Sequence, residues 1–388
     1  MKYKKSPAID DALQGMATQY PDTCAKFYLD QPSWAAKNVP AVRIQEGVDA
    51  LTPVLFTGGV HGRELAPPDA LLNFCENLLG ADSTGTDIIY NPFTDASGIK
   101  YDEYIVDNAT VRRILNTFSL FVVPCVNPDG RDFALSAPDK INKMWRKNRR
   151  PDPTCVGVDI NRNFPFVWDV DTYYQPSVIQ DIHVSKVPCD AKFRGYTQSP
   201  PPDSGPEPET QNLMNLVAQQ SIQYLVDVHM FGRTVLYPWG MDTDQIADPT
   251  QTFSNATWDG KRDGPAQSVY GEYVPATLLT TLAQLADAMV TEIKRSAGAD
   301  TTAIARSTYT AKQSALAGAT TGAFDDYTFG QQFLNPQSDI HSTFAFTLEC
   351  GYEKPGDNDG GFAPHPVTQY PKVEREVHAA LFGLLNAI

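Results

Sequence analysis

The stretch that most constrains the fold is residues 118–126, a nearly unbroken apolar run reading Phe-Ser-Leu-Phe-Val-Val-Pro-Cys-Val. A strand this apolar is typical of a sheet covered on both faces, because a solvated face would carry alternating polar residues. Three shorter apolar runs share this character, at 54–58, 224–228 and 344–348. Stretches with helical patterning lie between or after them, at 64–80, 207–220, 278–293 and 373–385. Strands that alternate with helices predict an α/β domain with a largely parallel sheet.

Ionisable residues stand at or just beyond the ends of three of these predicted strands. His61 follows the first run after two glycines, and Glu64 comes three residues later, in the first turn of the predicted helix. His229 ends the run at 224–228, and Glu349 ends the run at 344–348. Ligands bind at the carboxyl ends of strands in open α/β sheets. Two imidazoles and a carboxylate are a ligand set of catalytic zinc, with a fourth position left for water.

Composition narrows the classes of partner. Asp and Glu outnumber Lys and Arg by 46 to 31, for a formal charge of −15, which argues against nucleic acid as a partner. No apolar run approaches the length of a membrane span, and no stretch has the pattern of a signal peptide, so we expect no membrane partner. The six cysteines form no C-x-x-C pair, which disfavours a cysteine zinc knuckle.

Several separate blocks, in a fixed order along nearly the whole chain, carry a family resemblance. They are His61-Gly62-Arg63-Glu64, Asn127-Pro128-Asp129-Gly130, Trp145-Arg146-Lys147, residues 155–163, residues 229–240 and Phe346-Thr347-Leu348-Glu349. On these blocks the chain resembles the zinc metallocarboxypeptidases of the pancreatic carboxypeptidase A and B type. The resemblance implies one α/β catalytic domain over residues 1–388, with a mixed, largely parallel central sheet flanked by helices. A longer gap between the second and third ligands than in the pancreatic enzymes fits loop insertions near 81–104 and 169–205.

The resemblance also implies the chemistry of the site. His61, Glu64 and His229 would hold one zinc ion, and Glu349 would act as general base. Asp159 would orient the first zinc histidine, because metal-bound imidazoles usually need such a partner. Taken singly, each residue also has a plainer interpretation. Asp159 could be a turn residue, and Glu349 could be a buried structural acid.

A second group of residues would bind the substrate. Arg146 resembles the arginine that polarises the scissile carbonyl, although its basic cluster could also be a solvated face. Asn161 and Arg162 resemble the pair that binds the C-terminal carboxylate, with Arg63 lining the approach. The implied partners are therefore the C-termini of peptides or proteins.

The pocket for the departing side chain allows two interpretations. Family members carry an Asp-Trp pair, here Asp326-Tyr327, and the preceding residue lies at the base of this pocket. Asp325 in that position implies a preference for Lys and Arg; the competing interpretation turns Asp325 away and lines the pocket with Phe324. The mobile tyrosine that contacts substrates in the family is absent, since Gly318 stands in its register.

The cysteines give one further implication of the resemblance. Cys155 and Cys189 fall where the pancreatic enzymes have a disulfide, which would imply an oxidising compartment and hence secretion or the periplasm. Cys75 and Cys125 lie in apolar contexts and are expected as buried thiols. The resemblance gives no function to several other ionisable residues. We expect the histidines among them to be structural or on the surface: His183, His341, His365 and His378. We expect the aspartates to lie in surface loops: Asp242, Asp244, Asp248, Asp357 and Asp359.

Three functions remain open on the sequence. The leading one is a zinc-dependent exopeptidase that releases one C-terminal residue, with a basic preference. A related zinc amidohydrolase could instead cleave γ-glutamyl, peptidoglycan or acylamino-acid bonds; Arg146, Asn161 and Arg162 favour the exopeptidase because together they recognise a free α-carboxylate. A carboxypeptidase-like binding module without catalysis is disfavoured by the intact ligand set and Glu349.

Overall fold

The computed structural model describes residues 2–47, 51–95, 98–136, 140–195, 205–265, 269–334, 343–351 and 361–388. Its centre is an eight-stranded sheet. In spatial order the strands are β1 (Cys24–Tyr28), β2 (Pro40–Ile44), β8 (Phe118–Val123), β3 (Thr52–Gly58), β9 (Tyr224–Met230), β14 (Phe344–Cys350), β10 (Thr234–Tyr237) and β13 (Thr310–Gln313).

The four middle strands, β8, β3, β9 and β14, are parallel to one another. β2 is antiparallel to both of its neighbours, and β10 is antiparallel to β14 but parallel to β13. The predicted fold class, a mixed and largely parallel central sheet, is confirmed. All six residues of β8 are buried, as its continuous apolar run requires of a strand covered on both faces.

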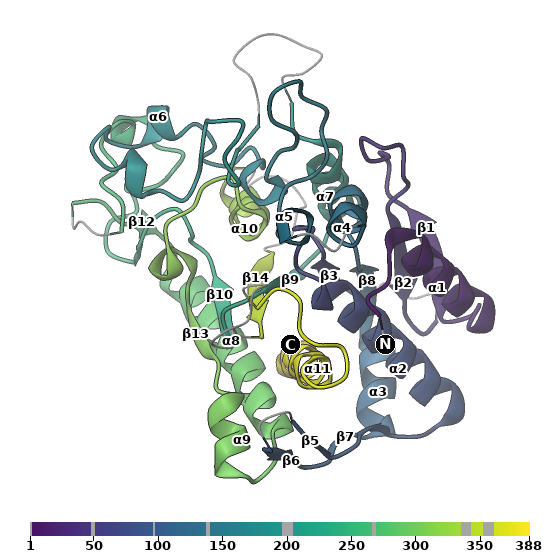
Figure 1. The fold of residues 1–388 in the computed structure, drawn as a ribbon. Coiled ribbons are helices and arrows are strands. Elements are labelled where there is room, and N and C mark those ends of the chain that lie inside the picture. Colours follow the sequence, from purple (N-terminus) through teal and green to yellow (C-terminus); the bar gives the residue numbers. More distant parts are fainter. Residues whose placement is uncertain are drawn as a thin grey trace.

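Helices cover both faces of the sheet (Figure 1). Below it in this view lie α2 (Ala66–Thr84), α3 (Asn108–Thr117), α8 (Ala276–Ser296), α9 (Thr301–Arg306) and α11 (Tyr370–Ala387). Above it lie α4 (Pro128–Ala134), α5 (Lys140–Lys143), α7 (Pro208–Gln219) and α10 (Phe324–Leu334). At one end, α1 (Ser6–Gln19) packs on β1 and β2. Several further elements are short: α6 (Val170–Tyr173), the 3₁₀ turns at Ile160–Arg162, Ile179–Asp181, Ala256–Trp258 and Ser314–Ala317, and the strands β11 (Asp244–Gln245) and β12 (Glu272–Tyr273).

Aromatic packing joins the lower helices to the sheet. Phe74 on α2 lies between Phe56 on β3 and Phe382 on α11, at ring-centroid distances of 5.8 and 5.1 Å. All three rings are fully buried. Burial of a phenylalanine side chain contributes roughly 1.5–3 kcal/mol. This cluster therefore fixes α2, and with it the segment that begins at His61, against the middle of the sheet.

The segment 81–104, expected to hold a loop insertion, contains regular structure: α2 continues to Thr84, and two small hairpins follow, β4 (Ile88–Tyr90) with β7 (Tyr104–Val106) and β5 (Phe93–Thr94) with β6 (Lys100–Tyr101). Helix α3 is capped by the Asp107 carboxylate, which accepts a bond from Thr110 N. Asn127 caps α4, since its side chain accepts a bond from Gly130 N. That 81–104 and 169–205 are insertions stays a prediction.

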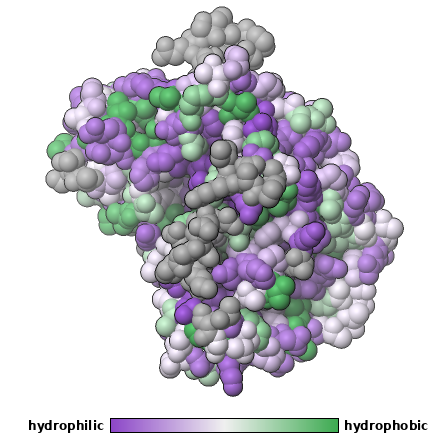
Figure 2. All heavy atoms as spheres, in the orientation of Figure 1, coloured by the Kyte–Doolittle hydropathy of each residue, from purple (hydrophilic) through white to green (hydrophobic). Residues whose placement is uncertain are grey.

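The face shown in Figure 2 is mainly hydrophilic, with hydrophobic residues in small groups among the polar ones. Among the described residues, no helix is long and apolar enough to cross a membrane.

Candidate active site

The sheet brings three chain segments together at the carboxyl ends of its middle strands. Gly58, the last residue of β3, pairs with Val228 of β9, and His229 pairs with Glu349 of β14. The chain leaves β3 through Gly59, whose φ of +64° suits glycine, and reaches His61 two residues later. Parallel pairing thus places side chains that are far apart in sequence at one edge of the sheet.

His61, Glu64 and His229 form a compact cluster of buried donors. Nδ1 of His61 lies 2.7 Å from Oε1 of Glu64, and Nδ1 of His229 lies 3.1 Å from Oε2 of Glu64. The two Nδ1 atoms are 3.1 Å apart. One donor atom from each residue lies within 4.8 Å of the others, and this is the only such group of three or more His, Cys, Asp or Glu side chains in the described chain. The donor set, two imidazoles and one carboxylate, fits zinc.

The ionisation of this cluster reflects its crowding. Burial alone would raise the pKa of Glu64, yet the imidazoles of His61 and His229 hold it well below its usual range. Burial opposes the charged form of His229, but Asp227 and Glu64 raise the pKa of this imidazole well above its usual value. Both shifts favour a charged carboxylate beside a positively charged partner, which is the electrostatic environment that a metal cation needs.

Two buried carboxylates hold the far sides of the imidazoles. Oδ1 of Asp159 lies 3.2 Å from Nε2 of His61, and Oδ2 of Asp227 lies 2.6 Å from Nε2 of His229. Thr57 donates to the other oxygen of Asp227 at 2.6 Å. With Nε2 engaged in this way, each imidazole presents Nδ1 to the cluster. Asp227 was missed in the sequence, although a charged residue inside an apolar strand, two positions before His229 and so on the same face, was a usable signal.

Glu349 stands beside the cluster with an unsatisfied carboxylate. Its Oε2 atom is buried and has no hydrogen-bond partner in the described structure. Burial raises the pKa of Glu349 to about 7, against the opposing field of His229. A carboxylate with a pKa near neutrality can take up and return a proton at neutral pH.

Arg146 and Arg63 lie near the same acids. Arg146 Nε donates to Oδ2 of Asp159 at 2.8 Å, the carboxylate that also faces His61. The guanidinium of Arg63 lies over the ring of Phe362, 4.0 Å from its centroid, and its buried Nε has no partner in the described structure.

A pocket of about 200 Å³ opens beside Glu349. Its lining includes Asn161, Arg162 and Asp325, together with Leu236, Ser314, Ala317, Gly318, Thr320, Ala323, Thr347 and His183. The Asn161 side-chain oxygen accepts from Phe324 N at 2.8 Å, which leaves the Nδ2 amide group as the donor of this side chain. Burial lowers the pKa of Arg162 only to about 10, so the guanidinium remains charged at neutral pH. The pocket thus combines donors for a carboxylate with an acid.

Asp325 is 4% exposed, and its Oδ2 lies 3.2 Å from the hydroxyls of both Ser314 and Thr347. Phe324 does not line the pocket; it stacks on Phe164 at 4.9 Å between ring centroids. Asp326 accepts from Gly240 N and is fully buried. Burial raises the pKa of Asp325, while the backbone N–H of Asp326 and the two hydroxyls favour its charged form.

Among the residues given no function, the structure separates three cases. His378 is buried, with Nε2 2.7 Å from the Ala70 carbonyl, and is structural as predicted; His365 is exposed. His183 is exposed but lines the pocket, which its position outside the matching blocks did not indicate. Placing Asp242 in a surface loop was wrong, because it is fully buried and burial raises its pKa to about 7. His341, Asp357 and Asp359 lie outside the described residues.

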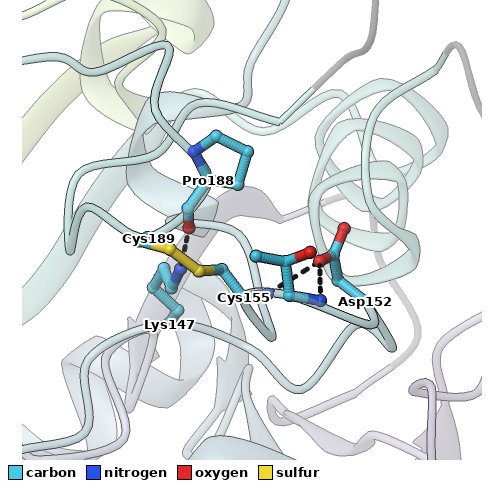
Figure 3. The surroundings of a disulfide bond; sticks show 6 residues. Lys147, Asp152, Cys155, Pro188 and Cys189 are labelled. Carbon is cyan, nitrogen blue, oxygen red and sulfur yellow. Dashed lines mark hydrogen bonds between the residues drawn. A yellow bond between two sulfur atoms is a disulfide. The ribbon is translucent and has the colours of Figure 1, made fainter.

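A disulfide joins Cys155 and Cys189, whose Cα atoms are 4.9 Å apart (Figure 3). Lys147 donates to the Pro188 carbonyl at 2.6 Å beside it, and Asp152 accepts from Cys155 N at 2.7 Å. The predicted pairing is present. The four other cysteines are buried free thiols, including Cys75 and Cys125 as predicted.

This fold and this cluster define a mixed α/β protein with a buried site of two histidines and one glutamate that suits a metal ion. Residues 9–379 match the family described as zinc carboxypeptidase, and the chain belongs to this family. It is 26% identical over 252 residues to carboxypeptidase B of Astacus astacus, covering 62% of this chain and 66% of that protein. It is 33% identical over 220 residues to metallocarboxypeptidase A of Trichophyton rubrum, covering 55% of this chain and 42% of that protein. The chain thus spans less than two thirds of these relatives.

Solved structures agree on the fold. The crystal structure of thrombin activatable fibrinolysis inhibitor superposes with a TM-score of 0.67 at 17% identity, over 99% of this chain and 74% of that one. Carboxypeptidase A of Helicoverpa armigera superposes with a TM-score of 0.66 at 18% identity, over 100% of this chain and 74% of that one.

Proposed function

We propose that this protein is a zinc-dependent carboxypeptidase that hydrolyses the C-terminal peptide bond of peptides and prefers Lys or Arg as the departing residue. The observation that carries the proposal is one pocket that joins Glu349, Asn161, Arg162 and Asp325 beside the metal-binding cluster. A carboxypeptidase needs these parts together: a base at the scissile bond, donors for the terminal carboxylate and a site for the last side chain.

His61, Glu64 and His229 would hold the ion, with Asp159 and Asp227 behind the imidazoles. Bound zinc supplies Lewis-acid chemistry, which polarises a carbonyl and lowers the pKa of water. Among the residues of the chain, Glu349 acts first: it accepts a proton from the attacking water as the new C–O bond forms. Arg146 stabilises the negative charge that develops on the carbonyl oxygen. When the C–N bond breaks, Glu349 returns the proton to the departing amine.

Asn161 and Arg162 position the substrate by binding its terminal carboxylate, and a guanidinium can do so with two hydrogen bonds. Arg63, whose guanidinium lies over the ring of Phe362, would line the approach. An amidated C-terminus lacks the charge these donors match, so we expect amidation to cost most of the activity. Equal rates on free and amidated peptides would favour the amidohydrolase, which cleaves γ-glutamyl, peptidoglycan or acylamino-acid bonds without this requirement.

The basic preference rests on Asp325. An apolar side chain in the pocket would leave a buried acid without a partner, whereas a guanidinium or ammonium group would pair with it. The test compares kcat/KM for blocked dipeptides ending in Arg, Lys, Phe and Leu, in wild type and in Asp325→Ala. We expect Arg and Lys to lead in wild type and to lose their advantage in the variant. A wild-type preference for Phe or Leu contradicts the assignment of Asp325.

The disulfide supports an oxidising compartment, and we propose that the protein is secreted or periplasmic. A binding module without catalysis is the third possibility. The complete ligand cluster and the raised pKa of Glu349 argue for the enzyme. Zinc content measured alongside hydrolysis separates the two, since the module would bind zinc and peptide without turnover.

A further inference from the structure

The lining of the pocket that contains Asp325 also includes a histidine, His183, that lies directly against a glycine, Gly318. A Cβ atom built on Gly318 would lie 2.4 Å from Cε1 and 2.6 Å from Nδ1 of His183. These distances are far below a normal contact, so the imidazole of His183 fills the space that a side chain at position 318 would need. Gly318 also has a φ of 132°, which side chains rarely tolerate.

The backbone at His183 is held from two sides. Arg162 Nε donates to the His183 carbonyl at 2.5 Å, and His183 N donates to the Ala319 carbonyl at 2.7 Å. The first bond ties His183 to the guanidinium proposed to bind the substrate carboxylate. The second ties it to the residue next to Gly318. These bonds fix the backbone from which the imidazole extends, and the imidazole lines the pocket while His183 remains exposed to solvent.

We propose that His183 is a specificity-determining residue whose imidazole contacts the side chain of the departing residue. This inference rests on the proposed function and deepens it. Asp325 is a buried hydrogen-bond acceptor in the lining of the pocket, and His183 is an exposed residue of the same lining. Partial burial, Lys192 and Arg162 all lower the pKa of His183, so the ring is neutral at neutral pH and can accept a hydrogen bond from a Lys or Arg side chain.

The test uses the zinc-loaded full chain and compares His183→Ala with wild type on peptides that end in Arg, Leu and Gly. We expect KM for the Arg peptide to rise roughly tenfold, the effect of losing one hydrogen bond and its packing. The Leu peptide should lose less, and the Gly peptide, which has no side chain to contact, should be unchanged. An equal loss on all three peptides overturns the proposal, because it would place the contact on the main chain. No change on any of them overturns it as well.

Gly318→Ala tests the same contact from the other side. The added Cβ must displace the His183 imidazole, so Gly318→Ala should raise KM for the Arg peptide when His183 is present. In the His183→Ala background the added effect should be smaller, because the displaced ring is already gone and only the backbone strain at position 318 remains. Additive effects in this double-mutant cycle contradict the proposal. Val187→Ala, at an exposed position in the same segment, is the matched control and should leave KM unchanged.

Calorimetric binding of free arginine separates this inference from the proposed function. Weaker binding to His183→Ala than to wild type supports the contact whether or not wild type hydrolyses peptides. If wild type cleaves peptides but both proteins bind arginine equally, His183 has no such role and the proposed function stands. If wild type neither cleaves peptides nor binds arginine, both fail.

Discussion

Oδ2 of Asp227 lies 2.6 Å from Nε2 of His229, and both residues project from the same face of β9. Asp227 receives a second bond from Thr57 on the neighbouring strand β3, so its carboxylate is fixed before any metal binds. Loss of such a carboxylate behind a metal-bound imidazole typically costs 10–100-fold in affinity or activity.

We therefore expect Asp227→Asn to weaken zinc affinity by about 10–100-fold, measured by competition with a chromophoric chelator. Asp242→Asn is the matched control, because Asp242 is equally buried but accepts a hydrogen bond from the backbone N–H of Thr243 instead of facing an imidazole. Unchanged zinc affinity in Asp227→Asn would show that Asp227 has no influence on the metal site.

Glu349→Gln should retain zinc and substrate binding while kcat falls by about 10²–10⁴-fold, the usual contribution of a general base. Zinc content and steady-state kinetics measure the two effects separately. Glu103→Gln, at an exposed site, should behave like wild type. Retention of most of the activity by Glu349→Gln would remove Glu349 from its proposed role.

The pH dependence of wild type adds an independent check on Glu349. A general base works in its deprotonated form, and burial raises the pKa of Glu349 to about 7 in the protein without metal. A nearby cation lowers this pKa, so kcat/KM should increase with pH and its acid limb should fall at or below pH 7. A limb at clearly higher pH would mean that another group controls the acid side of the profile.

Replacing both Cys155 and Cys189 by serine should lower the free energy of unfolding by about 3–4 kcal/mol, on the chain-entropy account of a disulfide. Denaturant titration measures this difference. The other four cysteines are free, so a reductant should affect wild type and leave the double variant unchanged. Equal stability of the two proteins would mean that the bond adds no constraint.

Glu209 should make the protein less stable as pH rises. It is fully buried beside Glu207, and burial followed by this repulsion raises its pKa to about 8. In the unfolded chain a glutamate has a pKa of about 4.3, so the folded protein holds the proton more tightly between these values. Stability from this group is complete at the acid end of the window and is lost as pH rises towards 8.

Glu209→Gln should therefore match wild type in Tm near pH 5 and exceed it near pH 9, measured by thermal scans across this range. The buried Oε1 of Glu209 has no partner in the described structure, which keeps the cost of replacing it small. A variant less stable than wild type at pH 9 would contradict this account.

The parts of the site that could be predicted are those with a short-range signal. Apolar runs located the strands, and His61, His229 and Glu349 at their ends were expected to lie together, because parallel strands share one edge for their carboxyl ends. The family resemblance supplied the roles of Asp159, Asn161 and Arg162 and the disulfide between Cys155 and Cys189. These signals depend on backbone pattern and ordered motifs.

The features that were missed depend on contacts between distant segments. Asp227 is distinguished only by a charge within an apolar strand, and its role becomes visible when β3 brings Thr57 beside it. His183 lies in a segment without a matching motif, and only the fold sets it against Gly318. Asp242 looked like a loop residue because its burial comes from tertiary packing and not from its neighbours in sequence.

The order of strands in the sheet has a consequence for the synthesis of this protein. β14 is the last strand of the described chain, yet it lies between β9 and β10, both formed from earlier residues. The middle of the sheet therefore stays open until this strand is inserted, and Glu349 arrives with it. A chain shortened before residue 344 would carry all three metal ligands but neither the proposed base nor a continuous sheet. On the proposed function, a growing chain on the ribosome should therefore hydrolyse no peptides until this strand has been synthesised and inserted.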